Sequence, residues 1–152
     1  SSAASDVYKR QEQEKLQGSE IQMSLITVDD TNTFSVEESI RDIFMDQTLP
    51  DIIICLNELS TTCVYQAVVD YNCVGEIAIL GYYDTDTILK AIERNVITAT
   101  ISIDTEQMGA FCVDALQEYY NYGYTSQYFT ADVTVIDQSN VEEYLGKQEE
   151  AE

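Results

Sequence analysis

The feature that most constrains the fold is a regular alternation of short, β-branched apolar runs with longer segments of helical periodicity. The clearest short run is Asp51–Leu56 (DIIICL), which is apolar along nearly its whole length, as expected of a parallel strand covered on both faces. Four further runs are predicted to be strands, at Ile21–Val28, Glu76–Leu80, Ile97–Ile103 and Asp132–Ile136. The resulting order βαβαβαβαβ, with short connections, predicts an α/β fold with an open, mostly parallel sheet flanked by helices.

Local signals set the bounds of the helices. Ser35 and Glu38 are three positions apart and predict a capping box that opens a short helix ending at Met45. Pro50 bars any continuation of that helix. Further helices are predicted at about 61–71, 85–95 and 106–122.

The two ends of the chain stand apart from this pattern. Residues 6–11 (DVYKRQ) are a literal translation of GAT GTG TAT AAG AGA CAG, which resembles the transposon end used to fragment DNA for sequencing. We therefore expect residues 1–11 to be a non-native, adapter-derived segment and the natural protein to continue upstream. Residues 146–152 are expected to form an acidic tail.

Charge and composition exclude several classes of function. The chain has 152 residues, with 28 Asp and Glu against 7 Lys and Arg, for a formal charge of −21. Phosphate backbones and anionic membrane surfaces would be repelled, so nucleic acids are not expected as partners of this chain. The sequence contains no His, which excludes Ser-His-Asp, Cys-His and His-based zinc chemistry. No pair of carboxylates is set across a defined cleft, so we expect no enzyme, no metal site and no cofactor.

The four cysteines follow no metal-binding pattern. They are Cys55, Cys63, Cys73 and Cys112, and none forms a C-x-x-C pair. We predict that all four are small buried side chains.

Polar and aromatic residues follow several of the predicted strands. Ligands of open α/β sheets bind outside the carboxyl ends of the strands. Those ends hold Asp29 and Asp30, Asn57 and Glu58, Tyr82 to Asp84, and Ile103 with Asp104. Asn57 is the best single candidate, because its amide both donates and accepts hydrogen bonds. The alternative role of Asn57 is the N-cap of the helix that follows.

Three stretches resemble one known superfamily. PDIIICLNELSTTCVYQAVVDYN, IAILGYYDTDTILKAIERNVITATISIDTEQMGAFCVDAL and VTVIDQSNVEEYL are similar to the C-terminal lobe of type I periplasmic binding proteins, the ribose-binding and LacI-like superfamily. The resemblance covers about residues 20–145. It implies that 12–103 and 131–145 form one lobe of a two-lobe fold, and that 104–130 is a crossover helix packing on an N-terminal lobe outside this chain.

The same resemblance implies a set of ligand-binding residues. Asn57 matches an Asn that hydrogen-bonds the sugar, and Tyr82 with Tyr83 replaces the Phe-Asp of a Gly-Phe-Asp motif, with Asp84 following one position later. Ile103 falls where the family has a hinge Gln. Because two of three polar ligands are replaced, the resemblance does not imply an ordinary pentose or hexose as the ligand. The Tyr rings can instead stack on a sugar or another planar solute, or they can simply cover the end of the sheet.

The resemblance also implies a function. It predicts a non-enzymatic protein that binds a small, sugar-like polar solute for an ABC permease or a sensor kinase. Such a protein is expected outside the cell or in the periplasm, held to the membrane only by an N-terminal lipoprotein anchor. The alternative is the effector-binding lobe of a LacI-type regulator. A response-regulator receiver is disfavoured, because Asn57 stands where the phosphate-accepting Asp would be and no Lys closes the final strand.

The crossover helix carries an apolar stripe whose cover is expected to lie outside this chain. Its members recur at helical spacing and are Met108, Phe111, Cys112, Ala115, Leu116 and Tyr119.

Overall fold

A four-stranded sheet organises the chain in a computed structural model, which describes residues 11, 14–28, 32–45, 48–126 and 128–149. The strands are β1 (Ile52–Ile54), β2 (Ala78–Tyr82), β3 (Ala99–Ile103) and β4 (Val133–Asp137), in the spatial order β1-β2-β3-β4. β1, β2 and β3 are parallel, and β4 runs antiparallel to β3. The predicted open, mostly parallel sheet is confirmed.

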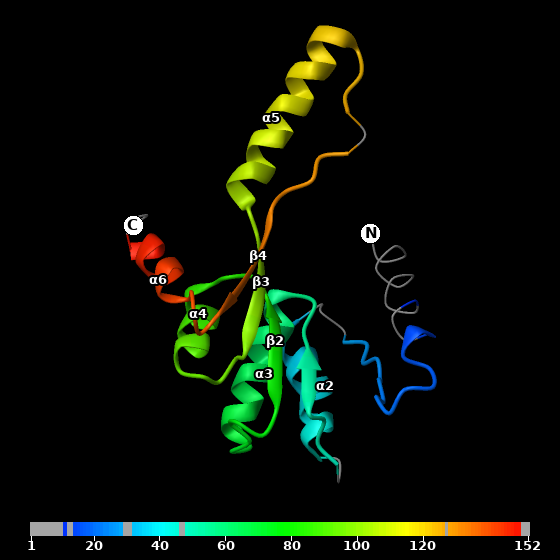
Figure 1. Cartoon of the computed structure of the whole chain (residues 1–152), viewed down its shortest axis with the longest axis vertical. Helices are drawn as coiled ribbons and strands as arrows, with labels where there is room; N and C mark the ends of the chain where they lie inside the picture. Colours follow the sequence, from blue (N-terminus) through cyan, green and yellow to red (C-terminus); the bar gives the residue numbers. More distant parts are fainter. Residues whose placement is uncertain (1–10, 12–13, 29–31, 46–47, 127, 150–152) are drawn as a thin grey trace.

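Three helices cover one face of this sheet. They are α2 (Thr33–Met45), α3 (Glu58–Asp70) and α4 (Asp86–Glu93). α3 and α4 each join neighbouring parallel strands in the same direction, so right-handed crossovers place both on the same face, and α2 packs on α3 (Figure 1). The core between these helices and the sheet consists of apolar side chains, among them Val36, Ile40, Val64, Val68, Ile79, Ile88, Leu89, Ile92 and Ile136.

Within the part of the chain that the structure describes, the opposite face of the sheet is largely uncovered. The strand register places Ile54 beside Leu80, Tyr82 beside Ile101, and Ile101 beside Val135, so these side chains share that face. Its most exposed members are Ile52, Ile54, Ile101, Val133 and Val135, at 43–62% exposure. The expectation that Asp51–Leu56 is covered on both faces is therefore wrong for β1, whose burial alternates along the strand.

A protruding arm extends beyond the sheet. It consists of one helix and the non-helical segment that returns from it, and we call it the hairpin. Helix α5 (Thr105–Tyr122) starts directly after β3 and projects away from the body, and the chain returns alongside it to β4 (Figure 1). Gln107 joins the two arms at the base of the hairpin, where its Nε2 donates to Asp132 Oδ2 and its Oε1 accepts from Asp132 N. α5 has no buried residue.

Several local predictions were wrong. Ile21–Val28 forms no strand; the segment is irregular, and Ile21, Leu25 and Ile26 are 48–61% exposed. A strand needs a hydrogen-bonded neighbour, which an apolar pattern alone does not guarantee. A final helix, α6 (Glu142–Glu149), covers part of the predicted acidic tail. Residues 1–10 of the predicted adapter segment lie outside the described residues.

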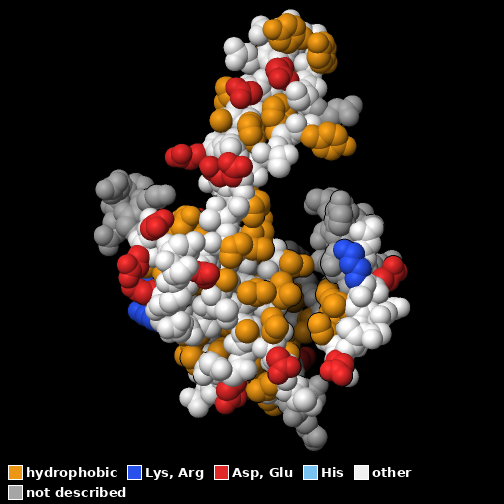
Figure 2. Space-filling view, in the orientation of Figure 1, with side chains coloured by type: hydrophobic (Ala, Val, Ile, Leu, Met, Phe, Trp, Pro, Cys, Tyr) orange, Lys and Arg blue, Asp and Glu red, His pale blue; other side chains and the backbone are white. Residues whose placement is uncertain are grey.

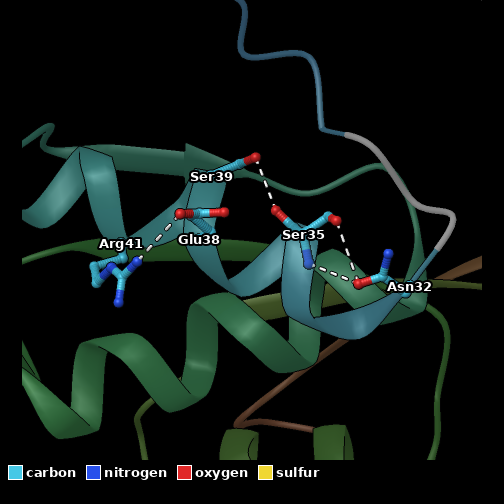
Figure 3. A network of polar contacts seen from close by, with 5 residues as sticks. All are labelled: Asn32, Ser35, Glu38, Ser39 and Arg41. Carbon is cyan, nitrogen blue, oxygen red and sulfur yellow. Dashed lines mark hydrogen bonds and ion pairs between the residues drawn. The ribbon is translucent and has the colours of Figure 1, made fainter.

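The capping box predicted at the start of α2 is also wrong. The cap is Asn32, whose Oδ1 accepts from Ser35 N (3.0 Å) and Ser35 Oγ (3.2 Å) (Figure 3). Glu38 does not reach back to the helix start and instead pairs with Arg41 at 3.7 Å (Figure 3).

Candidate functional site

The candidate site lies at the carboxyl edge of the parallel strands. β1, β2 and β3 end side by side, so the segments after them meet at one edge of the sheet. Asn57 follows β1, Tyr82 closes β2 with Tyr83 and Asp84 directly after it, and Ile103 closes β3. Asp29 and Asp30, also predicted at this edge, lie outside the described residues.

Asn57 is the N-cap of α3. Its backbone is extended (φ −152°, ψ 164°), and its Oδ1 accepts from Ser60 N at 2.7 Å. The capping role predicted as the alternative is thus present. It occupies the amide oxygen and leaves Nδ2 able to donate to a ligand, so the two roles of Asn57 are compatible.

Thr61 joins the start of α3 to the end of β2. It is fully buried, its Oγ1 donates to Asn57 O (2.8 Å), and the same oxygen accepts from Tyr82 N (3.0 Å). Gly81 permits this close approach, because a Cβ at that position would lie 2.7 Å from Thr61 Cγ2. Asn57 and Tyr82 are therefore held in one rigid unit.

Tyr83 has a strained backbone at the edge. Its φ of 80° lies in the left-handed region, which is a genuine outlier for a bulky residue. Two hydrogen bonds hold it there: Tyr83 N donates to Ile101 O (2.8 Å), and the buried Thr100 Oγ1 donates to Tyr83 O (2.6 Å). Such strain persists only where its surroundings over-determine it, and it gathers at functional sites.

Asp84 is fixed by the neighbouring strand. The buried Ser102 donates from its Oγ to Asp84 Oδ2 at 2.7 Å. Ile103 does not join this contact, because successive side chains of β3 alternate between the two faces of the sheet. Ile103 thus lies on the opposite face from Ser102, together with Ile101.

The edge combines the Asn57 amide and the Asp84 carboxylate with two Tyr residues. The backbone segments that carry Asn57, Tyr82, Tyr83 and Asp84 meet here, because three buried hydroxyl residues, Thr61, Thr100 and Ser102, hold the strand ends in place. The Tyr82 side chain lies on the same face of the sheet as Ile101 and Ile103. The sequence pattern did not predict a role for these hydroxyl residues. Two of them had a signal: Thr100 and Ser102 are polar at alternate positions of an otherwise aliphatic strand.

At this edge Asn57 is exposed, and Tyr82, Tyr83 and Asp84 are half-buried. Two shallow hollows lie elsewhere, one lined by Glu14–Met23 residues and one at the opposite end of the sheet beside Asn95, Thr98 and Gln138. Within the described residues, no group of His, Cys, Asp and Glu is placed to hold a metal ion, and no helix is long and apolar enough to cross a membrane. The edge can therefore form one wall of a binding site for a small polar solute.

Three of the four cysteines lie in the core, and the Cys55 thiol is hydrogen-bonded with Thr61 behind the edge. Cys55, Cys63 and Cys73 are buried as predicted, whereas Cys112 is exposed on α5, so the prediction of four buried thiols is wrong for Cys112. Burial raises the pKa of the Cys55 thiol from 9.0 to about 12. Burial, with a smaller contribution from Glu37, also raises the pKa of Cys63.

Comparison with known proteins gives similarity in structure only. No protein-family model matches the sequence, and a search of curated proteins finds no match either. Among solved structures, a solute-binding protein of an ABC transporter from Agrobacterium vitis bound with α-D-tagatopyranose has a TM-score of 0.78 at 14% identity, with 91% of this chain and 46% of that chain covered.

Two further structures extend this comparison. A sugar-binding protein of a sugar ABC transporter from Bacillus halodurans has a TM-score of 0.69 at 18% identity, covering 86% of this chain and 49% of that one. The XylFII-LytSN complex has a TM-score of 0.62 at 24% identity, covering 72% of this chain and 38% of that one. The chain thus spans 38–49% of the length of these proteins. Its fold is that of one lobe of the two-lobe, periplasmic-binding-protein-like architecture.

Proposed function

We propose that the carboxyl edge of the sheet binds a small, sugar-like polar solute. The observation that carries this proposal is the joint placement of Asn57, Tyr82, Tyr83 and Asp84 at one rigid edge. Asn57 Nδ2 would donate to a hydroxyl of the solute, Asp84 would accept from another, and a Tyr ring would stack on its C–H face. Solved structures of similar fold carry α-D-tagatopyranose and myo-inositol, two neutral polyhydroxylated molecules. No group in the described edge is arranged for catalysis, so the protein would bind its solute without turning it over.

A second lobe would supply the other wall of the site. The open edge and the uncovered stripe of α5 both support this arrangement, in which residues 104–130 pack on a companion N-terminal lobe. Ile103 and Asp104, where β3 passes into α5, would then lie at the hinge. Solute held between the lobes would favour their closed arrangement, and that shift in population would be the signal.

The partner of the closed form would be an ABC permease or a sensor kinase. Similar folds occur in solute-binding proteins of ABC transporters and in a complex with LytSN. The protein would work in the extracellular space or the periplasm, with a lipoprotein anchor upstream of this lobe. The alternative is the effector lobe of a LacI-type regulator, which the fold allows. The charge of −21 favours the exported binder, because a regulator must approach DNA.

Titration by NMR tests the proposed function. Because this chain supplies only one wall of the site, we expect D-tagatose or myo-inositol to bind weakly, with a Kd of about 1 mM. The chemical-shift changes should be confined to residues 57–61, 81–84 and 100–104. Nucleosides serve as a second class of neutral solute. If none of these compounds shifts the edge resonances, or if the shifts fall elsewhere, solute binding at this edge is wrong.

A further inference from the structure

Strand β3 carries two hydroxyl residues on the face of the sheet that the helices cover. Thr100 and Ser102 alternate with Ile101 and Ile103, which lie on the opposite, bare sheet face. Figure 2 shows that apolar side chains gather over the strands. Because Thr100 and Ser102 are only 1% and 7% exposed, each hydroxyl in these surroundings requires a hydrogen-bond partner within the molecule.

Both hydroxyls act on the segment that follows β2. Thr100 Oγ1 donates to Tyr83 O (2.6 Å), and Ser102 Oγ donates to Asp84 Oδ2 (2.7 Å). An ionised carboxylate accepts hydrogen bonds and cannot donate them, so the hydrogen between Ser102 and Asp84 belongs to the serine. The distance between Ser102 Oγ and Asp84 Oδ2 is typical of a hydroxyl bound to a carboxylate, which is stronger than a bond between neutral groups.

The backbone on both sides of Asp84 is fixed independently of Ser102. Before it, Tyr83 has a φ of 80° and donates from its N–H to Ile101 O at 2.8 Å. After it, Thr85 is the N-cap of α4, a helix whose inner face is buried in the core. The rotatable bonds of the Asp84 side chain are therefore the freedom that remains, and the bond from Ser102 restricts them.

We propose that Ser102 is a positioning residue for solute binding. Its hydroxyl holds the Asp84 carboxylate in the orientation that accepts a hydrogen bond from a solute hydroxyl. A carboxylate has about four acceptor positions, so the bond from Ser102 does not saturate it. Ordering a side chain during binding lowers affinity, and Ser102 orders Asp84 before the solute arrives. This inference deepens the proposed function and rests on it.

NMR titration of the 152-residue protein with myo-inositol and D-tagatose tests the role of Ser102. Ser102→Ala should raise the Kd about three- to tenfold, because the solute must then order the Asp84 side chain itself. Ser102→Thr keeps a hydroxyl at this position and should bind within about twofold of the parent protein. Ser39→Ala is the matched control, because it removes a half-buried hydroxyl that donates to Ser35 O within α2, outside the candidate site, and it should leave the Kd unchanged.

A double-mutant cycle separates positioning of Asp84 from a general structural effect. In the Asp84→Ala background, Ser102→Ala should not raise the Kd further, because the side chain through which Ser102 acts is gone. Urea unfolding measures the stability of each variant. The cycle is decisive even if Thr does not fit at the buried position 102, because it uses only Ala variants.

The titrations distinguish failure of this positioning role from failure of the proposed function. If neither compound shifts the edge resonances of the parent protein, sugar binding at the edge is wrong and the role of Ser102 falls with it. If the parent protein binds at the edge and Ser102→Ala binds equally well, only the positioning role is wrong. A loss of affinity that persists in the Asp84→Ala background, or that a folded Ser102→Thr variant does not recover, would also overturn it.

Discussion

At the residue scale, Asn57 combines a structural and a binding role in one amide. Its Oδ1 caps α3, whereas its Nδ2 is available to a ligand. Asn57→Asp keeps a capping oxygen and removes the donor, so we expect unchanged stability and about a fivefold or greater loss of solute affinity, the value of one neutral hydrogen bond. Asn57→Ala should lose affinity and also about 1 kcal/mol of unfolding free energy.

Urea unfolding and NMR titration of both variants separate the two roles. Ser60→Ala serves as the matched control, because it keeps the backbone N–H of residue 60, which donates to Asn57 Oδ1. Equal affinity of Asn57→Asp and the parent protein would show that the amide only caps the helix.

The contact between Gly81 and Thr61 provides a second prediction at this scale. Gly81→Ala would place a Cβ 2.7 Å from Thr61 Cγ2, and the overpacking should cost about 1–3 kcal/mol of unfolding free energy. Thr61→Ser keeps the bridging hydroxyl and removes the clashing methyl, so the double variant should recover part of the loss. A double-mutant cycle in urea checks this, and strictly additive effects would contradict it.

Cys55 predicts how stability changes at alkaline pH. Burial raises its folded pKa to about 12 from 9.0, so above pH 9 the unfolded chain loses the thiol proton while the folded chain keeps it. The unfolding free energy should therefore fall with rising pH through this window, by up to about 1.4 kcal/mol per pH unit from this group. Cys55→Ala should flatten the dependence in urea unfolding between about pH 8 and about pH 11. Cys112→Ala, which removes an exposed thiol, should not change it.

The candidate site was only partly predictable from individual residues. Asn57, Tyr82, Tyr83 and Asp84 directly follow the ends of strand-like runs, and a local pattern is enough to find them. The contact between Ser102 and Asp84 joins residues 18 positions apart. Its existence depends on the strand register, which the sequence pattern of either strand alone does not specify.

At the element scale, predictions succeeded where an element is defined by its own sequence. Four strands and the helices α2, α3, α4 and α5 occur where predicted, with bounds shifted by a few residues. Ile21–Val28 failed because strand formation depends on a neighbouring edge. The start of α2 was misplaced because Asn32 and Ser35 are both good caps, and the structure uses Asn32.

The tip of the hairpin gives a prediction for this scale. Glu118 Oε2 accepts from Ser126 N (2.9 Å), Thr125 Oγ1 (3.0 Å) and Ser126 Oγ (3.2 Å), and these hydrogen bonds, the Ser126 N–H first, lower the pKa of Glu118. Because the pKa is lowered, the stabilisation from these hydrogen bonds to Glu118 is present above the ordinary pKa of Glu. It is lost as the pH falls through the lowered value. Glu118→Gln should speed hydrogen exchange of the Ser126 amide, and Asp114→Asn, on the same helix, should not. Equal exchange rates of the Ser126 amide in both variants would contradict a stabilising role of the Glu118 hydrogen bonds.

At the scale of the whole molecule, the bare sheet face and the α5 stripe show the limit of sequence patterns. The strands are apolar on both faces, which predicts cover on both sides, yet the described chain covers one. A hydrophobic pattern states that a surface must be buried, and it does not state whether the same chain, a second lobe or a second copy buries it.

The charge of −21 leads to a prediction for the molecule as a whole. Carboxylates far outnumber cations, so the folded state concentrates like charge that the unfolded chain spreads out, and this repulsion lowers stability. Raising NaCl from about 10 mM to about 1 M shortens the screening length roughly tenfold, from about 30 to about 3 Å, and should raise Tm by several degrees. Melting curves at two protein concentrations check that self-association does not contribute to this effect. Glu76→Gln and Glu76→Lys, at an exposed position, should raise Tm at low salt in a one-to-two ratio that follows the charge removed, and both gains should vanish in about 1 M NaCl. A melting temperature that is flat or falls with NaCl would mean that the carboxylates are compensated locally, and not that they repel one another across the whole surface.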